Sequence, residues 1–420
     1  MIQKNKWAWA WVPTLYFAQG LPYALVVTVS VIMYKRLGVS NADIGLYTSF
    51  LYIPWVIKPL WSPFVDLKST KRNWFLGMQL LASIALLAIG LTLPTNIFFV
   101  TSLACFWMVA FASATNDIAT DGYYMIGLTE DRQSFFVGLR SVFYKLANVT
   151  GQGLLVVLAG LLEEHYGDNT KAWSYTMISA ALLMLILTIS NFFVAPKFES
   201  SQAITLERPK GFLEVFSTFF KKSGMGMALA FILFFRLGES QLVKMASPFL
   251  LDPTSEGGLG YSTSEVGTIY GTIGVIFLTI GGILGGILIS RQGLKKWMLP
   301  MLISLNAPNA LYALLAITKT TNIYAVTGTV IVEQFGYGFG IAGFMVYLIY
   351  IAEGASKTSH YALATGFMAL GMMLPGLISG YMQEWLGYDG FFIWVVLAAL
   401  PAFVLLKYLD YPADFGKSKT

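Results

Sequence analysis

Residues 73–93 read NWFLGMQLLASIALLAIGLTL and contain no charged side chain. As a helix, such a run rises about 30 Å, which matches the hydrocarbon thickness of a bilayer. Similar apolar runs lie on both sides of it along the chain. Together they predict twelve membrane-spanning helices, at 8–34, 42–64, 73–93, 97–119, 135–162, 172–194, 224–250, 263–289, 297–317, 322–351, 361–386 and 389–408.

The composition also indicates a membrane protein. Of the 420 residues, 56% are hydrophobic and 12% are charged, and the mean hydropathy is +0.66. A soluble domain carries about 25% charged residues, so this chain has too little charge for soluble surfaces. One cysteine and two histidines rule out a disulfide framework and leave too few ligands for a histidine- or cysteine-rich metal site. We expect no metal, no cofactor and solvated positions for His165 and His360.

Basic residues set the predicted orientation, because cytoplasmic loops of membrane proteins are enriched in Lys and Arg. With both termini in the cytoplasm, most of the 27 basic residues fall in inner segments. The outer segments then hold Lys35, Arg36, Lys171 and Lys319. Membrane orientation therefore explains the net charge of +5, and no nucleic-acid partner is needed. The expected surroundings are a lipid bilayer.

A repeat relates the two halves of the chain. Residues 40–45 (SNADIG) and 262–267 (STSEVG) are both helix starts of the capping type, 222 residues apart. Each is followed by an apolar run and then by a basic loop, at 66–72 and 290–296. This pattern predicts an all-α membrane protein of two pseudo-symmetric six-helix bundles. The predicted domains are an N-terminal bundle at 1–194, a cytoplasmic linker at 195–223 and a C-terminal bundle with a short cytoplasmic tail at 224–420.

The basic loops resemble the loop motif of the major facilitator superfamily, which has a glycine, three residues, an acid, a basic residue, then glycine and a basic pair. The second loop keeps Gly286 and Gly293 but has Ser290 at the acidic position. Any short inner loop is enriched in basic residues, so a single copy of this motif would be weak evidence. The match carries weight because the motif occurs twice, at matching positions in the two halves. The resemblance implies gating roles for Asp66, Lys71, Arg72, Arg291 and Lys295.

Three segments are similar to the AmpG-type muropeptide permeases within that superfamily. They are FAQGLP at 17–22, IKPLWSPFVD at 57–66 and NDIATDGY at 116–123. The resemblance implies a bacterial inner-membrane transporter of peptidoglycan fragments, namely anhydro-muropeptides or amino sugars. Related permeases carry siderophores or acetyl-CoA, so an importer of siderophores or oligosaccharides stays open as an alternative.

Carboxylates inside the predicted spans are the candidates for proton coupling. An ionisable side chain at membrane depth costs about 2.5–3.5 kcal/mol on insertion scales, so each should face a cavity or a partner. Asp117 and Asp121 are four residues apart on one helical face, and two carboxyls so close favour proton binding by one of them. They could instead pair with basic groups and lock a gate. The proton-coupling candidates are Asp117, Asp121, Glu239 and Glu333.

Polar residues at helical spacing are the candidates for substrate binding. Arg140, Tyr144, Asn148 and Gln152 recur every four residues and form a stripe that lipid cannot satisfy, so it should line a cavity. Arg236 could instead simply neutralise Glu239, and the glycines that follow Glu333 could serve close helix packing. Buried bases slightly outnumber buried acids, which favours an anionic cargo. The substrate-binding candidates are Tyr16, Gln19, Tyr23, Lys58, Arg140, Tyr144, Lys145, Asn148, Gln152, Arg236, Lys244, Gln334 and Tyr337.

These features predict a secondary active transporter. The sequence has no phosphate-binding glycine loop, no nucleophile elbow and no soluble segment long enough for an ATPase domain. We expect a proton symporter that imports a small anionic molecule by alternating access, with no catalytic residues. A membrane-embedded acyl or glycosyl transferase ranks below it, since an enzyme does not need two pseudo-equivalent halves.

Overall fold

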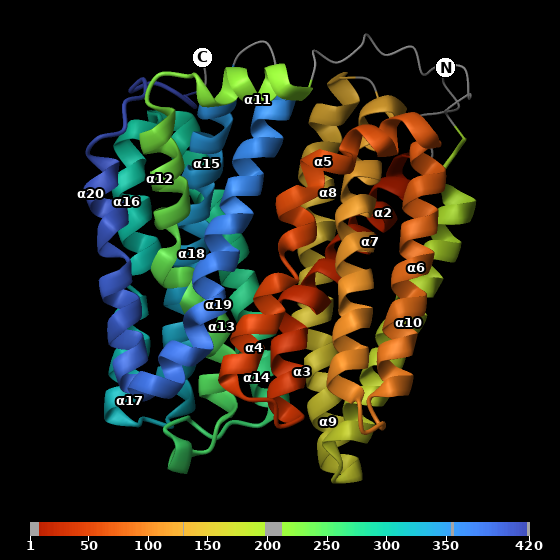
Figure 1. The fold of residues 1–420 in the computed structure, drawn as a ribbon, viewed down its shortest axis with the longest axis vertical. Helices are drawn as coiled ribbons and strands as arrows, with labels where there is room; N and C mark the ends of the chain where they lie inside the picture. The colour runs from red at the N-terminus through yellow and green to blue at the C-terminus, as the bar shows by residue number, and fades with distance from the viewer. Residues whose placement is uncertain (1–7, 129, 198–211, 354–356, 418–420) are drawn as a thin grey trace. The chain divides into compact units, whose positions relative to one another are not determined.

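The structure is a computed structural model that describes residues 8–128, 130–197, 212–353 and 357–417. Within these ranges the regular secondary structure is entirely helical (Figure 1). Among the described residues, ten helical segments are long and apolar enough to cross a membrane: 8–36, 71–92, 98–127, 139–166, 169–194, 225–251, 263–292, 294–318, 323–352 and 360–406.

Two features reconcile these ten segments with twelve predicted spans. The predicted span 42–64 is divided between α4 (Asn41–Phe50) and α5 (Ile53–Lys68), each shorter than a membrane span. The last two predicted spans fall in one continuous segment that includes α19 (Lys357–Ala398). Gly387 breaks that helix with a φ of 68°, in the left-handed region that favours glycine. Every predicted span thus has a helical counterpart, and the all-α membrane fold class is confirmed.

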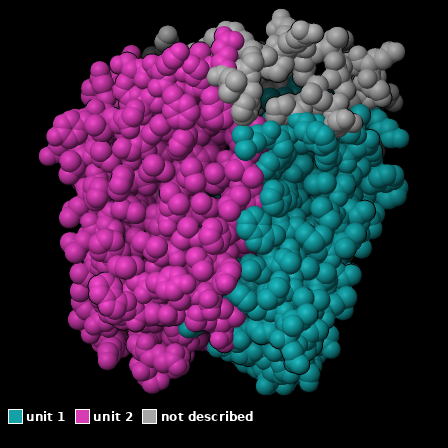
Figure 2. All heavy atoms as spheres, in the orientation of Figure 1, with its two compact units in different colours: residues 1–37, 60–207, 263–271 teal, residues 38–59, 208–262, 272–420 magenta. Residues whose placement is uncertain are grey.

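The chain divides into two compact units, coloured separately in Figure 2. Unit 1 comprises residues 1–37, 60–207 and 263–271, and unit 2 comprises residues 38–59, 208–262 and 272–420. Each unit therefore contains a short segment from the other half of the sequence. The two segments, 38–59 and 263–271, begin beside the repeated helix starts noted above.

Unit 1 is built from long helices around an aromatic core. The Trp11 and Tyr123 rings meet edge to face with centroids 5.0 Å apart, and Phe75 meets Tyr123 at 5.1 Å. At Gly20 a Cβ would lie 2.7 Å from the Tyr144 carbonyl oxygen, so this glycine allows two helices to pack closely. The helices are α2 (Ala8–Ala24), α3 (Ser30–Arg36), α6 (Lys71–Thr92), α7 (Phe98–Gly127), α8 (Glu130–Val149), α9 (Val156–Tyr166), α10 (Asn169–Val194) and α14 (Thr263–Val266), with π-helical turns at Leu25–Val29 and Thr150–Leu155.

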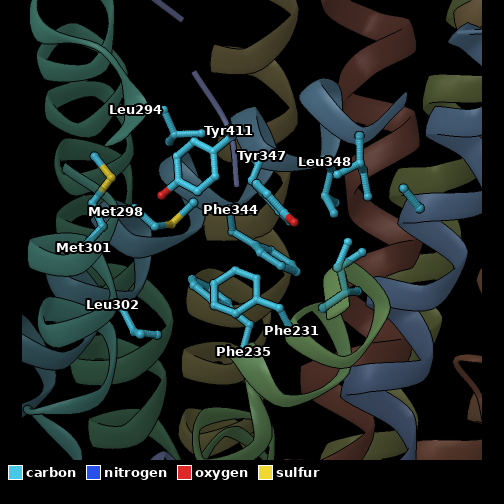
Figure 3. Close-up of a cluster of buried hydrophobic side chains, with 14 of the residues drawn as sticks. Phe231, Phe235, Leu294, Met298, Met301, Leu302, Phe344, Tyr347, Leu348 and Tyr411 are labelled. Carbon is cyan, nitrogen blue, oxygen red and sulfur yellow. The ribbon is translucent and has the colours of Figure 1, made fainter. Parts of the chain in front are cut away.

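Unit 2 has its own core, shown in Figure 3. The Phe235 and Phe344 rings stack with centroids 4.2 Å apart, and Phe231 packs against Phe235. The helices of this unit, besides α4 and α19, are α11 (Phe212–Phe220), α12 (Met225–Phe235), α13 (Leu237–Leu251), the 3-10 turn Thr254–Glu256, the π-helical turn Gly267–Gly274, which unit 1 shares, α15 (Val275–Gln292), α16 (Leu294–Asn306), α17 (Asn309–Thr318), α18 (Ile323–Ala352) and α20 (Leu400–Leu406).

The glycines of α18 serve close packing. A Cβ on Gly338 would lie 1.9 Å from the Leu278 carbonyl oxygen in α15, and one on Gly336 would lie 1.9 Å from the Ser304 carbonyl oxygen in α16. Neither position could accept a larger residue without displacing backbone. The packing interpretation of this glycine-rich stretch therefore accounts for both residues.

The predicted linker 195–223 contains a helix, α11, while its residues 198–211 lie outside the described part of the chain. His360 is buried against α11, with Nε2 3.2 Å from the Thr218 hydroxyl and its ring 5.4 Å from that of Phe219. The expectation that His360 is solvated was wrong, because packing between α11 and α19 covers it. His165 is exposed, as expected.

Candidate functional site

The predicted coupling and binding residues fall into two sets. Unit 1 holds Tyr16, Gln19, Tyr23, Asp117, Asp121, Arg140, Tyr144, Lys145, Asn148 and Gln152. Unit 2 holds Lys58, Arg236, Glu239, Lys244, Glu333, Gln334 and Tyr337.

In unit 1, Tyr16 joins an acid from α7 and a base from α8. Its hydroxyl donates to Asp121 Oδ1 at 2.9 Å and accepts from an Arg140 terminal nitrogen at 3.1 Å. The Arg140 guanidinium also lies 3.7 Å from Asp121 and 5.0 Å from the centre of the Tyr16 ring. Asp121 is therefore paired with a base, which agrees with the structural interpretation of this residue.

One turn further along α2, Gln19 donates from Nε2 to Asp117 Oδ1. Tyr16 and Gln19 are three residues apart, and Asp117 and Asp121 are four apart, so each pair lies on one helical face. The order of the contacts reverses between the two helices, as expected where α2 and α7 run antiparallel. Asp117 thus has an amide donor where Asp121 has a guanidinium.

The predicted polar stripe runs from Arg140 on α8 to Gln152 in the π-helical turn that follows, and it contains a buried acceptor without a hydrogen-bond partner among the described residues. The Tyr144 ring lies 6.5 Å from the Tyr23 ring, and Lys145, Asn148 and Gln152 are half-buried. Asn148 Oδ1 is buried and accepts no hydrogen bond from the described residues. A buried acceptor without a donor is unfavourable, so this amide is a suitable contact for a polar ligand.

In unit 2, Arg236 and Glu239 form a buried ion pair. Arg236 lies between α12 and α13 with a non-helical backbone conformation, and its Nε donates to Glu239 Oε2 at 2.8 Å. A terminal nitrogen of Arg236 donates to the Tyr337 hydroxyl at 2.6 Å, and the guanidinium lies 4.9 Å from the Tyr337 ring centre. The geometry supports mutual neutralisation of Arg236 and Glu239.

Glu333 is buried in a different environment. It is 1% exposed, and its carboxylate accepts from Gln334 Nε2 at 3.0 Å. No base in the described part of the chain forms an ion pair with it. A buried carboxylate whose hydrogen-bond donor is a neutral amide is a favourable place for a proton.

Lys244 is buried on α13 at 1% exposure. Its Nζ donates to Thr48 Oγ1 at 2.9 Å and lies 5.1 Å from the centre of the Tyr52 ring. Both partners come from residues 38–59, the segment of the N-terminal half that belongs to unit 2. Lys58 is half-buried in α5, at the end of the same segment.

The predicted gating residues of the first loop are held inside unit 1. Arg72 Nε donates to the Ala195 carbonyl at 2.8 Å, and its terminal nitrogen donates to the Phe192 carbonyl at 2.5 Å, so the side chain caps α10. Lys71 is buried, and its stem packs against Gly122. The side chain of Asp66 lies outside the described residues.

The second basic loop contacts the C-terminal tail of the described chain. Arg291 and Lys295 are exposed, and the Lys295 ammonium lies 6.0 Å from the Tyr411 ring centre. The Leu294 backbone N–H donates to the Phe415 carbonyl at 2.8 Å. Burial raises the pKa of the Tyr411 hydroxyl to about 12, so the ring stays neutral beside the loop.

Sequence reasoning missed Glu163, which is buried in α9. Both of its carboxylate oxygens accept from Arg36 Nε at 3.1 Å, and Oε1 also accepts from Trp173 Nε1 at 2.8 Å. Oε2 accepts from the Thr263 hydroxyl at 2.6 Å. Glu163 thereby ties the segment 263–271 into unit 1.

Asn41, which was also missed, ties the segment 38–59 into unit 2. Its Nδ2 lies 2.6 Å from Gln383 Oε1 and 3.0 Å from the Tyr388 hydroxyl, which in turn donates to Asp252 at 2.6 Å. Asn41 and Thr263 are 222 residues apart, the offset of the repeat. The repeated helix start was thus a signal for both clusters, because it predicted equivalent positions in the two halves.

The comparison with known families decides the assignment. A family model described as Major Facilitator Superfamily matches residues 14–359, most of the chain. The chain belongs to the major facilitator superfamily. Members of this superfamily bind small-molecule substrates and lie in lipid membranes, so this is a multi-pass transport protein.

Two relatives share the sequence over nearly its full length. The "Anhydromuropeptide permease" of Escherichia coli strain K12 is 27% identical over 402 residues, which cover 93% of this chain and 77% of the relative. The "Putative transporter AmpG 4" of Rickettsia conorii is 25% identical over 415 residues, covering 94% and 95%. The resemblance to AmpG-type permeases is confirmed by both.

Solved structures confirm the fold. The nucleoside transporter NupG is similar with a TM-score of 0.72 at 17% identity, covering 96% of this chain and 98% of NupG. A D-xylose-proton symporter is similar with a TM-score of 0.71 at 14% identity, covering 98% and 99%. At these identities the likeness establishes the architecture and leaves the cargo to other arguments.

Proposed function

We propose that this protein is a proton-coupled importer of anionic peptidoglycan fragments, namely anhydro-muropeptides or the amino sugars derived from them. It would act in the bacterial inner membrane with both termini in the cytoplasm. The relatives named above support the cargo, and the half-buried bases Arg140 and Lys145 and the buried Lys244 suit its negative charge. The observation that carries proton coupling is Glu333, buried with a neutral amide donor and no described base.

The proposed cycle uses alternating access, with residues 1–194 and 224–420 as the two moving halves and 195–223 joining them. Glu333 and Asp117 take up protons from the outer side and release them to the cytoplasm. Neutralising a carboxylate at membrane depth lowers the free energy of the loaded protein. Asp121 and Glu239, which pair with bases, would hold the binding residues in position.

Uptake into proteoliposomes tests the proposal. With an acidic outer buffer, the purified protein should accumulate radiolabelled anhydro-muramyl disaccharide against its gradient. Glu333→Gln should abolish this accumulation but retain exchange of labelled for unlabelled cargo, because binding survives while coupling is lost. Glu353→Gln, at the exposed end of the same helix, is the matched control and should behave as wild type.

Two outcomes would contradict the proposal. Unchanged pH-driven accumulation by Glu333→Gln and Asp117→Asn would remove the coupling assignment. Accumulation of a neutral disaccharide in place of the anionic one would assign the protein to oligosaccharide import.

A further inference from the structure

The pairing of Lys244 is unusual for a buried lysine. Its ammonium is held by neutral groups, the Thr48 hydroxyl at 2.9 Å and the face of the Tyr52 ring at 5.1 Å. Thr48 donates its own proton to the Ile44 carbonyl at 2.6 Å, so it offers Lys244 a lone pair. No carboxylate in the described ranges forms an ion pair with Lys244. A protonated Lys244 therefore has no counter-ion among the residues that the structure describes.

The neutral surroundings of Lys244 favour replacement of the Thr48 hydroxyl by a charged partner. A hydrogen bond between an ammonium and a carboxylate is roughly twice as strong as one between neutral groups, and a buried charge is stabilised by an opposite charge. A carboxylate that reaches Lys244 should displace the Thr48 hydroxyl.

A second donor lies beside Lys244. The Ser49 hydroxyl is buried and has no hydrogen-bond partner among the described residues. A Cβ on Gly376 of α19 would lie 2.4 Å from Ser49 Oγ and 3.6 Å from Lys244 Cε, so both side chains meet at this glycine. An ammonium and a hydroxyl on side chains that meet at one glycine can each bind one oxygen of a carboxylate.

We propose that Lys244 and Ser49 form the docking point for the carboxylate of the cargo, and that this carboxylate replaces Thr48 as the partner of Lys244. The inference rests on the proposed function for the nature of the cargo, a muramyl sugar whose lactyl ether ends in a carboxylate. It adds the group of the cargo that is recognised and the bond that is exchanged.

The exchange would also loosen α4. Figure 1 shows α4 beside α13 and α19. Residues 38–59 are held on unit 2 by the Asn41 cluster, by the Ala42 backbone N–H, which donates to Glu384 at 2.9 Å, and by the bond between Thr48 and Lys244. A carboxylate that takes over Lys244 removes the last of these attachments. Arrival of the cargo then favours release of α4 from α13.

Binding measurements with two probes test the docking point. The probes are N-acetylmuramic acid and its methyl ester, titrated calorimetrically into the purified full-length protein in detergent. The wild type should bind the acid at least tenfold more tightly than the ester, and Lys244→Gln should bind both alike. Lys407→Gln, which changes an exposed lysine of the same unit, should keep the wild-type preference.

Thr48→Val gives the sharper test, because the expected sign is opposite to that of a structural role. Removing the competing hydroxyl should tighten binding of the acid about threefold to tenfold and leave the ester unchanged. Thr279→Val is the matched control, since that hydroxyl bonds to the Val275 carbonyl of its own helix, and it should alter neither affinity.

Three results would overturn the docking point: equal affinities for acid and ester in the wild type, an undiminished preference in Lys244→Gln, or weaker acid binding by Thr48→Val. If Lys244→Gln does not fold, the sign of the Thr48→Val effect decides. A preference that depends on Lys244, without uptake of either probe into proteoliposomes, would support the docking point and refute the import function. Equal uptake of acid and ester by wild type and Lys244→Gln would refute the docking point and support the import function.

Discussion

Replacing Glu239 tests whether this carboxylate serves the ion pair with Arg236 or proton coupling. Glu239 is completely buried and accepts from Arg236 at 2.8 Å. Removing one member of a buried ion pair leaves an uncompensated charge and typically destabilises a protein by about 3–5 kcal/mol. Arg236 keeps its bond to Tyr337 at 2.6 Å and the ring at 4.9 Å. We therefore expect Glu239→Gln to lose about 3 kcal/mol, the lower end of that range.

A separate double-mutant cycle uses Arg236→Met, Glu239→Met and the double variant with both substitutions. Apolar residues of similar volume often replace a buried ion pair without loss, so we expect a stability within about 1 kcal/mol of wild type. Equilibrium unfolding of the two single variants and the double variant in detergent measures the coupling. If the ion pair is the whole role of Glu239, the double variant also retains proton-driven uptake.

The reasoning fails if Glu239→Gln loses less than about 1 kcal/mol, or if the double variant is as unstable as both single variants added together. Proton-independent uptake by a stable double variant would assign Glu239 to coupling and not to the ion pair.

Three further predictions concern stability. Gly380→Ala should unfold at a markedly lower temperature than the wild type, because a Cβ there would lie 1.8 Å from the Asn41 carbonyl oxygen. Gly77→Ala, which has open space around it, should gain up to about 1 kcal/mol of stability from helix propensity. Equal changes in stability for the two variants would contradict the packing argument. Arg72→Gln should lose about 1.5–3 kcal/mol in denaturant unfolding because it uncaps α10, and no loss would show that water caps that end equally well. The hydrogen bond from the backbone N–H of Lys171 lowers the pKa of Asp168. The Asp168 carboxylate therefore stabilises the start of α10 at pH values above the ordinary aspartate pKa, and this stabilisation is lost as the pH falls through the lowered pKa. Hydrogen exchange of the backbone amides in the first turn of α10 should show this loss in the wild type and not in Asp168→Asn.

The sequence was sufficient for the fold class because a membrane helix is a local signal. An uncharged run such as 73–93 predicts a span without reference to any other residue, and the structure has α6 there. The interruption between α4 and α5 was not predicted. It falls at Leu51 and Tyr52, where two turn residues separate helices that are both strongly apolar, so hydropathy does not register it.

The candidate site was predictable to the extent that it depends on helical spacing. Tyr16 and Gln19 share one face of α2, as their spacing indicated, because a helix fixes which of its own residues share a face; that this face meets α7 is seen only in the structure. Glu163 was missed, because it lies just beyond the predicted span 135–162. Its burial comes from Arg36 and Thr263, more than 90 residues away in either direction, and contacts at that separation leave no periodic signal.

The exchanged segment 263–271 has a consequence for biosynthesis. Residues 1–37 and 60–207 emerge from the ribosome well before residue 263, so the bundle they form must wait in the membrane with one face incomplete. On that face Gly160 later receives Ser264, whose backbone nitrogen would lie 2.3 Å from a Cβ at this position. A larger residue at 160 would block the late insertion, and we expect it to expose the nascent protein to membrane quality-control proteases.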